Sequence, residues 1–343
     1  MNEARFEHIT SNYEKLRIVV VGDFCLDRYL EIDPSKTETS IETGLPVHNV
    51  VNVRAQPGAA GTILNNLIAL GVGEIYPVGC CGFDGEGFEL WRALEAKRGV
   101  KLNGFVQTSD RRTFTYCKPL VLSPGKPPVE LNRLDSKNWT PTPVLLQGKL
   151  LNNLLSLAES AEAVVLMDQV DVPETGVVTR RLLDAVKELA GRKSDLPILA
   201  DSRRGLRDFP PVIFKMNAAE LASHSGRKAD LNLDDIKTLA RELSQKNSRA
   251  VFVTAAERGM ICASPSGDVG HVPALPLRGP IDIVGAGDSV TANLAAALAG
   301  GADLREALEL ANAAASVVIH QLGTTGTASV QQIRQARLDA ARS

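Results

Sequence analysis

Short, uninterrupted apolar runs recur along the chain and alternate with segments of helical period. The segments 177–190 and 233–245 have helical period, and Asp303 with Glu306 three residues later forms a capping box that begins another helix. Strands that are apolar throughout are typical of a parallel sheet covered on both faces, so the pattern predicts an α/β fold. We expect the strands at about residues 17–22, 74–79, 163–168, 197–201, 211–216 and 250–254.

Residues 28–55 and 104–135 break this rhythm. They lack helical period, and residues 113–118 alternate as a strand does, between breaks made by proline and glycine. An antiparallel flap that projects from the sheet explains both stretches. No internal repeat or low-complexity linker divides the chain, so we expect a single domain, 1–343, that carries this flap.

Composition narrows the class of protein. A chain of 343 residues can bury a full core, and a formal net charge of −2 gives no electrostatic case for nucleic acid or an anionic membrane as a partner. The N-terminal residues contain no apolar signal region, and no stretch approaches a membrane span. Five cysteines without CxxC spacing are typical of reduced thiols, so we expect a cytoplasmic protein.

Motifs then narrow the chemistry. The chain has no HExxH, no GxxxxGK[ST] and no GxGxxG, which removes the commonest zinc, P-loop and dinucleotide readings. The most informative segment is Asp282-Ile283-Val284-Gly285-Ala286-Gly287-Asp288, which precedes an alanine-rich helical run, residues 289–299. Gly285 to Gly287 therefore begin a helix whose free N–H groups suit a phosphate.

Asp288 is the unusual residue of this segment, because a carboxylate beside an anion site repels the anion. It has a purpose there if it accepts a proton from the hydroxyl that attacks a phosphate, which is what phosphoryl transfer needs. An acidic first turn that only complements the helix dipole explains the same residues equally well when they are taken alone.

The segment DxxGAGD resembles the C-terminal signature of the ribokinase/PfkB family of carbohydrate kinases. Five further segments resemble motifs of this family and follow one another in the same order as in the family, over nearly the whole chain. They are residues 20–29, 56–71, 217–220, 253–260 and 311–315. Three segments are most similar in sequence to the heptose-7-phosphate kinase branch, and they are GDFCLDRY (22–29), NRLD (132–135) and ANAAASVVIHQLGTTG (311–326).

The resemblance implies a ribokinase-like fold in which the two flap stretches form a small β-lid over a sugar site. It implies ATP and Mg²⁺ as cofactors, with Asp288 as the base and the backbone of Gly285, Ala286 and Gly287 as the anion hole. A monovalent cation as a further cofactor and a homodimer formed through the lid are also family expectations. The remaining implied contacts are Asp27, Gly58 and Thr62 on the sugar side, and Asn217, Glu220, Thr254, Gly259 and Asn312 on the nucleotide side.

Two of these assignments have competing structural explanations. Asp27 follows the first strand by a few residues, at the edge where strand ends line a crevice, and a solvated loop acid is the alternative to a sugar ligand. Asn217 and Glu220 share one face of a helix start. The resemblance gives them water-mediated magnesium and phosphate binding, whereas a capping pair needs the same residues.

The chain departs from the family pattern at four positions. Ala59 and Ala256 replace glycines, and Ile283 removes a hydroxyl usual before GAGD. Thr62 replaces an asparagine that binds sugar, and it suits a helix N-cap as well as a ligand.

Four cations lie in the flap, Arg111, Arg112, Lys118 and Arg133, where they form either a solvated surface or a site for a phosphate on the sugar. Strand alternation puts Arg112 on the face of Phe114 and Tyr116 and Arg111 on the other face, which makes Arg112 the substrate contact.

These observations predict an ATP-dependent kinase that phosphorylates a hydroxyl of a sugar or sugar phosphate, with a heptose phosphate favoured. The small molecule is then its substrate, with no nucleic acid or membrane partner. A nucleoside kinase of the same family is the first alternative, and it would need an aromatic-lined lid. A non-catalytic sugar- or nucleotide-binding paralogue is the second, kept open by the four departures and opposed by the presence of Asp288.

Overall fold

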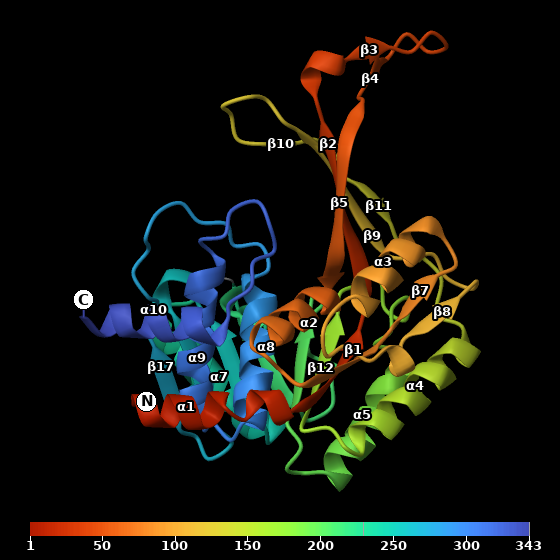
Figure 1. Ribbon diagram of the computed structural model, residues 1–343. Helices are drawn as coiled ribbons and strands as arrows, with labels where there is room; N and C mark the ends of the chain where they lie inside the picture. The colour runs from red at the N-terminus through yellow and green to blue at the C-terminus, as the bar shows by residue number, and fades with distance from the viewer. Residues whose placement is uncertain (229, 343) are drawn as a thin grey trace.

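The computed structural model describes residues 1–228 and 230–342. Figure 1 shows a large sheet flanked by helices and a small sheet that projects away from it. The helices are α1 (Glu3–Thr10), α2 (Ala60–Ala69), α3 (Gly85–Glu95), α4 (Val144–Ala158), α5 (Arg180–Arg192), α6 (Ala218–His224), α7 (Leu233–Asn247), α8 (Ala286–Ala299), α9 (Leu304–Val318) and α10 (Val330–Arg342).

The large sheet is mostly parallel. Its strands, in spatial order, are β17 (Val269–Val272), β16 (Met260–Ala263), β15 (Val251–Thr254), β14 (Ile213–Asn217), β13 (Ile198–Ser202), β12 (Ala163–Asp168), β1 (Arg17–Gly22) and β6 (Glu74–Val78). The strands from β15 to β6 are parallel, and β16 and β17 add an antiparallel edge. The six predicted strands are confirmed within two residues at either end, and so is the α/β fold.

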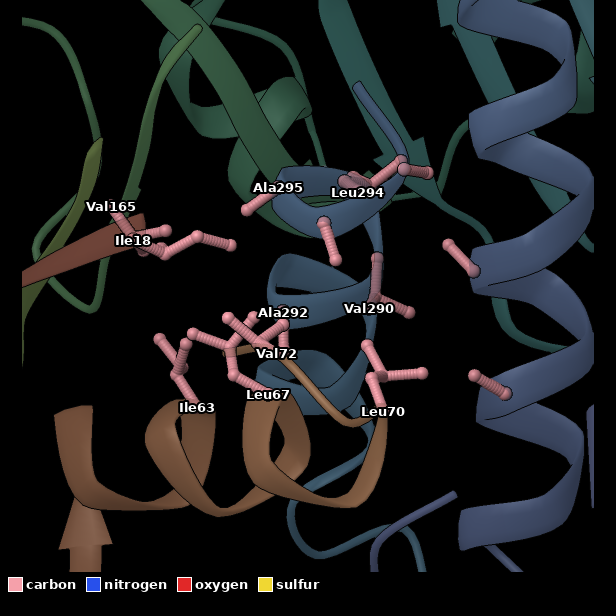
Figure 2. Packing of buried hydrophobic residues seen from close by; sticks show 14 of the residues in the cluster. Ile18, Ile63, Leu67, Leu70, Val72, Val165, Val290, Ala292, Leu294 and Ala295 are labelled. Carbon is pink, nitrogen blue, oxygen red and sulfur yellow. The ribbon is translucent and has the colours of Figure 1, made fainter. Parts of the chain in front are cut away.

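Both faces of this sheet are buried, which explains why its strands are apolar throughout. Along β1, Ile18 and Val20 face a core shared with α1, α2, α3, α8, α9 and α10. Val19 and Val21 face a second core shared with α4, α5, α6 and α7. Figure 2 shows the first core, where leucines and isoleucines of α2 lie against the small side chains of α8.

The small sheet is built from two separate stretches of the chain. Its spatial order is β10 (Val129–Glu130), β9 (Thr115–Val121), β2 (Phe24–Ile32) and β5 (Val50–Ala59), and β11 (Leu134–Ser136) also pairs with β9. β2 pairs with β9 in parallel, so the prediction of an antiparallel flap is wrong at this pair. β2 follows the large-sheet strand β1, whereas β9 follows β8, and the two run side by side in the same direction.

Four short strands of the described residues lie outside these two sheets. β3 (Glu38–Thr39) and β4 (Pro46–Val47) form a hairpin at the far end of the small sheet. β7 (Cys80–Gly82) pairs in parallel with β8 (Val106–Thr108), so the beginning of the stretch 104–135 joins β7 rather than the small sheet. Residues 109–114 belong to no strand, which means that the predicted alternation through 113–118 begins only at Thr115.

The junction between the two sheets is short and sterically tight. Gly22 ends β1 at φ +154°, and a Cβ there would lie 2.1 Å from the carbonyl oxygen of Met167. The buried carboxylate of Asp23 then accepts hydrogen bonds from the N–H groups of Gln169 (2.9 Å) and Val177 (2.7 Å). These contacts fix where β2 leaves the large sheet and thereby orient the small sheet.

Two of the alanines that replace family glycines have positive φ. Ala59 ends β5 at φ 53° and ψ −117° and is followed directly by α2, and Ala256 has φ 49°. This backbone region favours glycine, and a residue with a Cβ is strained there by about 1–3 kcal/mol.

No helix in the described part of the chain combines the length and apolar character needed to cross a membrane.

We predict that Ala59→Gly stabilises the protein. Glycine relieves the strain at φ 53°, although it loses the contact of one buried methyl group, so we expect a net gain of about 1 kcal/mol. The free energy of unfolding in urea measures the change. Ala60→Gly is the matched control, because Ala60 is buried at the first position of α2 and glycine there should cost up to about 1 kcal/mol. A less stable Ala59→Gly protein would contradict the strain argument.

Candidate active site

The segment 282–288 lies at the start of α8. Gly285 is the N-cap residue at φ 80°, and α8 begins at Ala286, so the predicted helix start is confirmed. The side chain of Asp282 accepts a hydrogen bond from the N–H of Val284 (3.0 Å) and shapes the turn. Among the described residues, the N–H groups of Gly287 and Asp288 have no acceptor. The turn therefore presents free N–H groups at the positive end of a helix of 14 residues.

A buried ion pair supports this helix start from below. Lys215, in the middle of β14, places its Nζ 2.7 Å from Oδ2 of Asp201 at the end of β13. The hydroxyl of Thr291 in α8 donates to the same oxygen at 2.9 Å. A Cβ on Gly287 would lie 3.0 Å from the lysine Nζ, so the ammonium group lies directly beneath the turn.

This surrounding shifts the acid–base properties of Asp288. Burial raises the pKa of Asp288 to about 7, and the negative charges of Asp201 and Asp27 raise it while Lys215 opposes them. Burial lowers the pKa of Lys215, but Asp201, Asp288 and Glu220 outweigh that effect and the pKa is raised overall. Asp288 is thus a carboxyl group that titrates near neutral pH beside a permanently charged lysine, as a general base requires.

Asp27 lies inside β2, not in a loop after the first strand, and it is 4% exposed, so the alternative of a solvated loop acid is wrong. Its Oδ1 is 3.5 Å from Nζ of Lys118 on β9. Burial raises the pKa of Asp27, and Lys118 acts in the opposite direction.

The carboxylate of Asp27 lies over Gly58 of the neighbouring strand. A Cβ on Gly58 would come within 2.6 Å of Asp27 Oδ2 and 2.8 Å of Cys25 Sγ. Glycine at position 58 therefore provides the space in which the Asp27 carboxylate is held.

Asn217 and Glu220 form a capping box at the start of α6. The Asn217 side chain accepts from the Glu220 N–H (2.8 Å), and the Glu220 carboxylate accepts from the Asn217 N–H (2.7 Å). Burial raises the pKa of Glu220, Asp201 adds to the shift, and Lys215 opposes it. The capping function is therefore present, and the pair lies beside the Lys215–Asp201 ion pair.

The remaining nucleotide-side residues divide into two places. Thr254 ends β15 and pairs in register with Asn217, which brings it to the strand ends near α6. Gly259 (φ 84°) and Asn312 both contact the turn at Pro273. A Cβ on Gly259 would lie 2.1 Å from the Val272 carbonyl oxygen, and Asn312 Nδ2 donates to the Pro273 carbonyl at 2.9 Å.

Thr62 is not a helix cap. β5 runs directly into α2, so Ala59 holds the N-cap position and Thr62 is the third residue of the helix, 1% exposed.

The alternation argument for Arg112 is also wrong, because residues 109–114 form no strand. The two arginines still differ. Arg111 is buried, and its guanidinium donates to the carbonyls of Thr140 (2.9 Å) and Thr175. Arg112 is exposed and lines a pocket with Lys137, Trp139 and Asp171.

Sequence reasoning missed Asp201 and Lys215. One signal was available, because Lys215 interrupts the apolar run 211–216 and a charged residue inside a buried strand needs a partner. The identity of that partner could not be read from spacing.

The site fits the cofactors that a kinase needs. Free N–H groups of the Gly285–Asp288 turn and the ammonium group of Lys215 suit the charge of a transferring phosphoryl group. The described residues contain no group of three or more His, Cys, Asp or Glu side chains that could hold a metal ion. Magnesium needs no such cage, because it keeps several waters and binds through one or two carboxylates and the substrate phosphates.

Similarity to known proteins extends over most of the chain. Residues 15–331 match the family described as pfkB family carbohydrate kinase. The chain is similar to the bifunctional protein HldE of Hyphomonas neptunium, with 30% identity over 93% of this chain and 63% of the relative. It is 31% identical to the bifunctional protein HldE of Rhodospirillum rubrum, over 92% of this chain and 61% of the relative. The chain thus spans a little over three fifths of the length of these curated relatives.

The fold is similar to solved ribokinase-like structures. Ribokinase of Arabidopsis thaliana complexed with ribose and ATP has a TM-score of 0.68 at 20% identity, covering 94% of this chain and 98% of that one. Phosphofructokinase-2 of Escherichia coli in complex with fructose-6-phosphate has a TM-score of 0.70 at 18% identity, covering 95% and 100%. These likenesses confirm the ribokinase-like fold.

The family match covers most of the chain, and the enzyme class follows from it. This protein belongs to the pfkB family of carbohydrate kinases.

Proposed function

We propose that this kinase transfers the γ-phosphoryl group of ATP to a hydroxyl of a sugar phosphate, with a heptose phosphate as the favoured acceptor and Asp288 as the general base. The observation that carries the proposal is the position of Asp288. Its carboxyl group, with a pKa raised to about 7, lies in the first turn of α8 beside unpaired N–H groups and feels the charges of both Lys215 and Asp27. A base, an anion hole and a candidate acceptor ligand thus meet in one place.

Separate residues bind the acceptor, remove its proton and stabilise the transferred charge. Asp27, whose carboxylate is held over Gly58, accepts hydroxyl hydrogens of the acceptor, and Thr62 is the second candidate ligand on the sugar side. Asp288 orients the reacting hydroxyl and takes its proton. The N–H groups of Gly285, Gly287 and Asp288, with Lys215 beneath them, stabilise the negative charge that the transferring group carries. The N–H of Ala286, which the family resemblance includes in this set, instead donates to the Ile283 carbonyl (3.2 Å).

On the nucleotide side, Mg²⁺ would supply positive charge that compensates the phosphates of ATP. Glu220 and Asn217 would hold it through water, since both lie at the helix start beside the ion pair of Lys215. Thr254 at the neighbouring strand end, and Gly259 with Asn312 around the Pro273 turn, would form the walls of the nucleotide site.

A phosphate on the acceptor has a candidate partner in Arg112. Arg111 is committed to backbone carbonyls, whereas the Arg112 side chain is exposed at a pocket that Lys137 also lines. Lys118 is paired with Asp27 and Arg133 with Asp135 (2.7 Å), so neither replaces Arg112 in this role. The similarity to HldE proteins supports a phosphorylated heptose as the acceptor.

We also propose that two copies associate through the small sheet. β5 is its edge strand, and Val50, Val51 and Val53 on it are 43%, 51% and 45% exposed. An exposed apolar edge strand is a ready surface for pairing with a second copy. Activation by a monovalent cation is a further proposal, supported by the similarity to a phosphofructokinase-2 solved in complex with potassium (TM-score 0.73).

Asp288→Asn should abolish turnover while the protein still binds ATP. The amide keeps the shape of the site but cannot accept the proton, so we expect kcat to fall by at least ~10²-fold. ADP release with a panel of sugars and sugar phosphates measures activity, and calorimetry measures nucleotide binding. Asp184→Asn on α5 is the control for the same chemical change, since the Asp184 carboxylate is exposed and pairs with the exposed Arg180 (3.6 Å). Turnover comparable to wild type in Asp288→Asn would remove Asp288 as the base.

The pH dependence should follow the titration of Asp288. Its pKa is raised to about 7, and only the ionised form accepts a proton, so kcat/KM should rise with pH through about 7 and fall about tenfold per unit well below it. Asp201→Asn removes one of the charges that raise this pKa, and it also leaves Lys215 free to lower it. The acid limb of that variant should therefore move to lower pH. A limb at the same pH in both proteins would contradict the assignment.

Preference for a phosphorylated acceptor should depend on Arg112. The measurement is the ratio of kcat/KM for heptose 7-phosphate to that for the free heptose. Arg112→Ala should lower the ratio by at least ~10-fold, and Arg112→Lys should restore it only in part, because lysine lacks the bidentate guanidinium. Arg54→Ala is the control, because Arg54 is paired with Glu31 (2.6 Å) elsewhere on the small sheet. A wild-type preference for the free sugar would refute the phosphate contact.

A further inference from the structure

The loop between α9 and α10 lies against the start of α8. We call residues 319–327 of this loop the strap. The Ile319 carbonyl accepts from the N–H of Asp282 (2.7 Å), and Asp282 Oδ2 accepts from the N–H of Gly323 (3.1 Å). Within the strap, the side-chain amide of Gln321 donates to the Thr327 carbonyl (2.7 Å) and accepts from the Thr327 N–H (3.1 Å). The strap is thus closed on itself and attached to the turn that carries the anion hole.

Thr325 packs directly on the N-cap of α8. A Cβ on Gly285 would lie 3.2 Å from Cβ and 3.4 Å from Cγ2 of Thr325. Gly285 is the N-cap residue and has φ 80°, and its backbone conformation sets the direction of the N–H groups in the first turn. The threonine side chain packs against this residue. A displacement of Thr325 would therefore displace the anion hole.

The same threonine is bonded to the small sheet. Gln56 Nε2 on β5 donates to Thr325 Oγ1 at 2.6 Å, between residues 269 positions apart in the chain. Gln56 is the cross-strand partner of Asp27 in the register of β2 and β5. The strand pair β2–β5, which carries Asp27, is therefore connected to the start of α8 through the side chain of Thr325.

We propose that Gln56 and Thr325 are positioning residues that couple the small sheet to the anion hole. Gln56 holds Thr325 against Gly285, and the first-turn N–H groups are thereby aligned toward the transferring phosphoryl group. Without this contact the anion hole loses its alignment. The inference rests on the proposed role of the Gly285–Asp288 turn.

Kinetics with heptose 7-phosphate as acceptor form the first test. Thr325→Val keeps the shape that packs on Gly285 and removes the hydroxyl, and Gln56→Leu removes the donor. Each should lower kcat about 5- to 10-fold, as expected for the loss of one hydrogen bond, and leave the Kd of ADP within about twofold of wild type. The double variant should be no worse than either single one, because both remove the same contact.

Two further variants separate positioning from general damage. Thr325→Ser retains the hydroxyl and should recover most of the wild-type kcat. Thr324→Val changes the neighbouring hydroxyl of the strap and should leave kcat unchanged. Multiplying effects in the double variant, or a kcat of Thr325→Val within about twofold of wild type, would overturn the proposal.

Hydrogen exchange in the unliganded protein is the second test, and it needs no acceptor. Gln56→Leu should speed exchange of the amides in residues 282–288 and 321–327, whereas α7 should exchange as in wild type. Unchanged exchange in both segments overturns the coupling. If no acceptor of the panel is phosphorylated but exchange responds as expected, the substrate assignment fails and the coupling stands.

Discussion

A lysine buried in the middle of a parallel sheet must be paired with negative charge, and the candidate active site is organised around that requirement. Lys215 lies on β14 among apolar neighbours, and its ammonium group is compensated by Asp201 on the next strand. Breaking such a buried pair by removing one partner commonly costs about 3–5 kcal/mol, so the two groups hold their strands in a fixed relation. Thr291 extends the pair to α8, which places the helix start and Asp288 over a fixed positive charge. Burial raises the pKa of Asp288, Asp201 adds to the rise and Lys215 opposes it, so both members of the pair act on this carboxyl group.

The orientation of the small sheet depends on a second constraint, which is the tight packing and hydrogen bonding of the junction where it joins the large sheet. Gly22 is pressed against the Met167 carbonyl, and Asp23 is held by two backbone N–H groups of the segment after β12. β2 therefore leaves in a defined direction and delivers Asp27 toward α8, close enough for its charge to act on Asp288. The contact of Gln56 with Thr325 gives the small sheet a second attachment, this time to the strap.

The four departures from the family pattern have different physical meanings. Ala59 and Ala256 keep the backbone conformation that glycine normally adopts and accept strain for it. Thr62 is buried within α2, and its hydroxyl lacks the two-ended hydrogen bonding of the asparagine amide usual in the resembled family. Ile283 is 74% exposed beside the helix start and removes a hydroxyl without disturbing the turn. None of them touches the Lys215–Asp201 pair or removes Asp288.

The sequence by itself determined the elements whose cause is local. Apolar runs located the six parallel strands, because strands buried on both faces need apolar side chains at every position. The GAGD segment and the pairs Asn217–Glu220 and Asp303–Glu306 located helix starts, because capping depends on residues three positions apart. Only the tertiary structure decided the parallel pairing of β2 with β9, the point at which β9 begins, and therefore the different surroundings of Arg111 and Arg112. It also decided that Lys215 meets Asp201 and that Gln56 meets Thr325. These contacts join residues that are distant in the chain, and the periodicity of hydrophobic and polar positions carries no information about which distant strands and loops lie side by side.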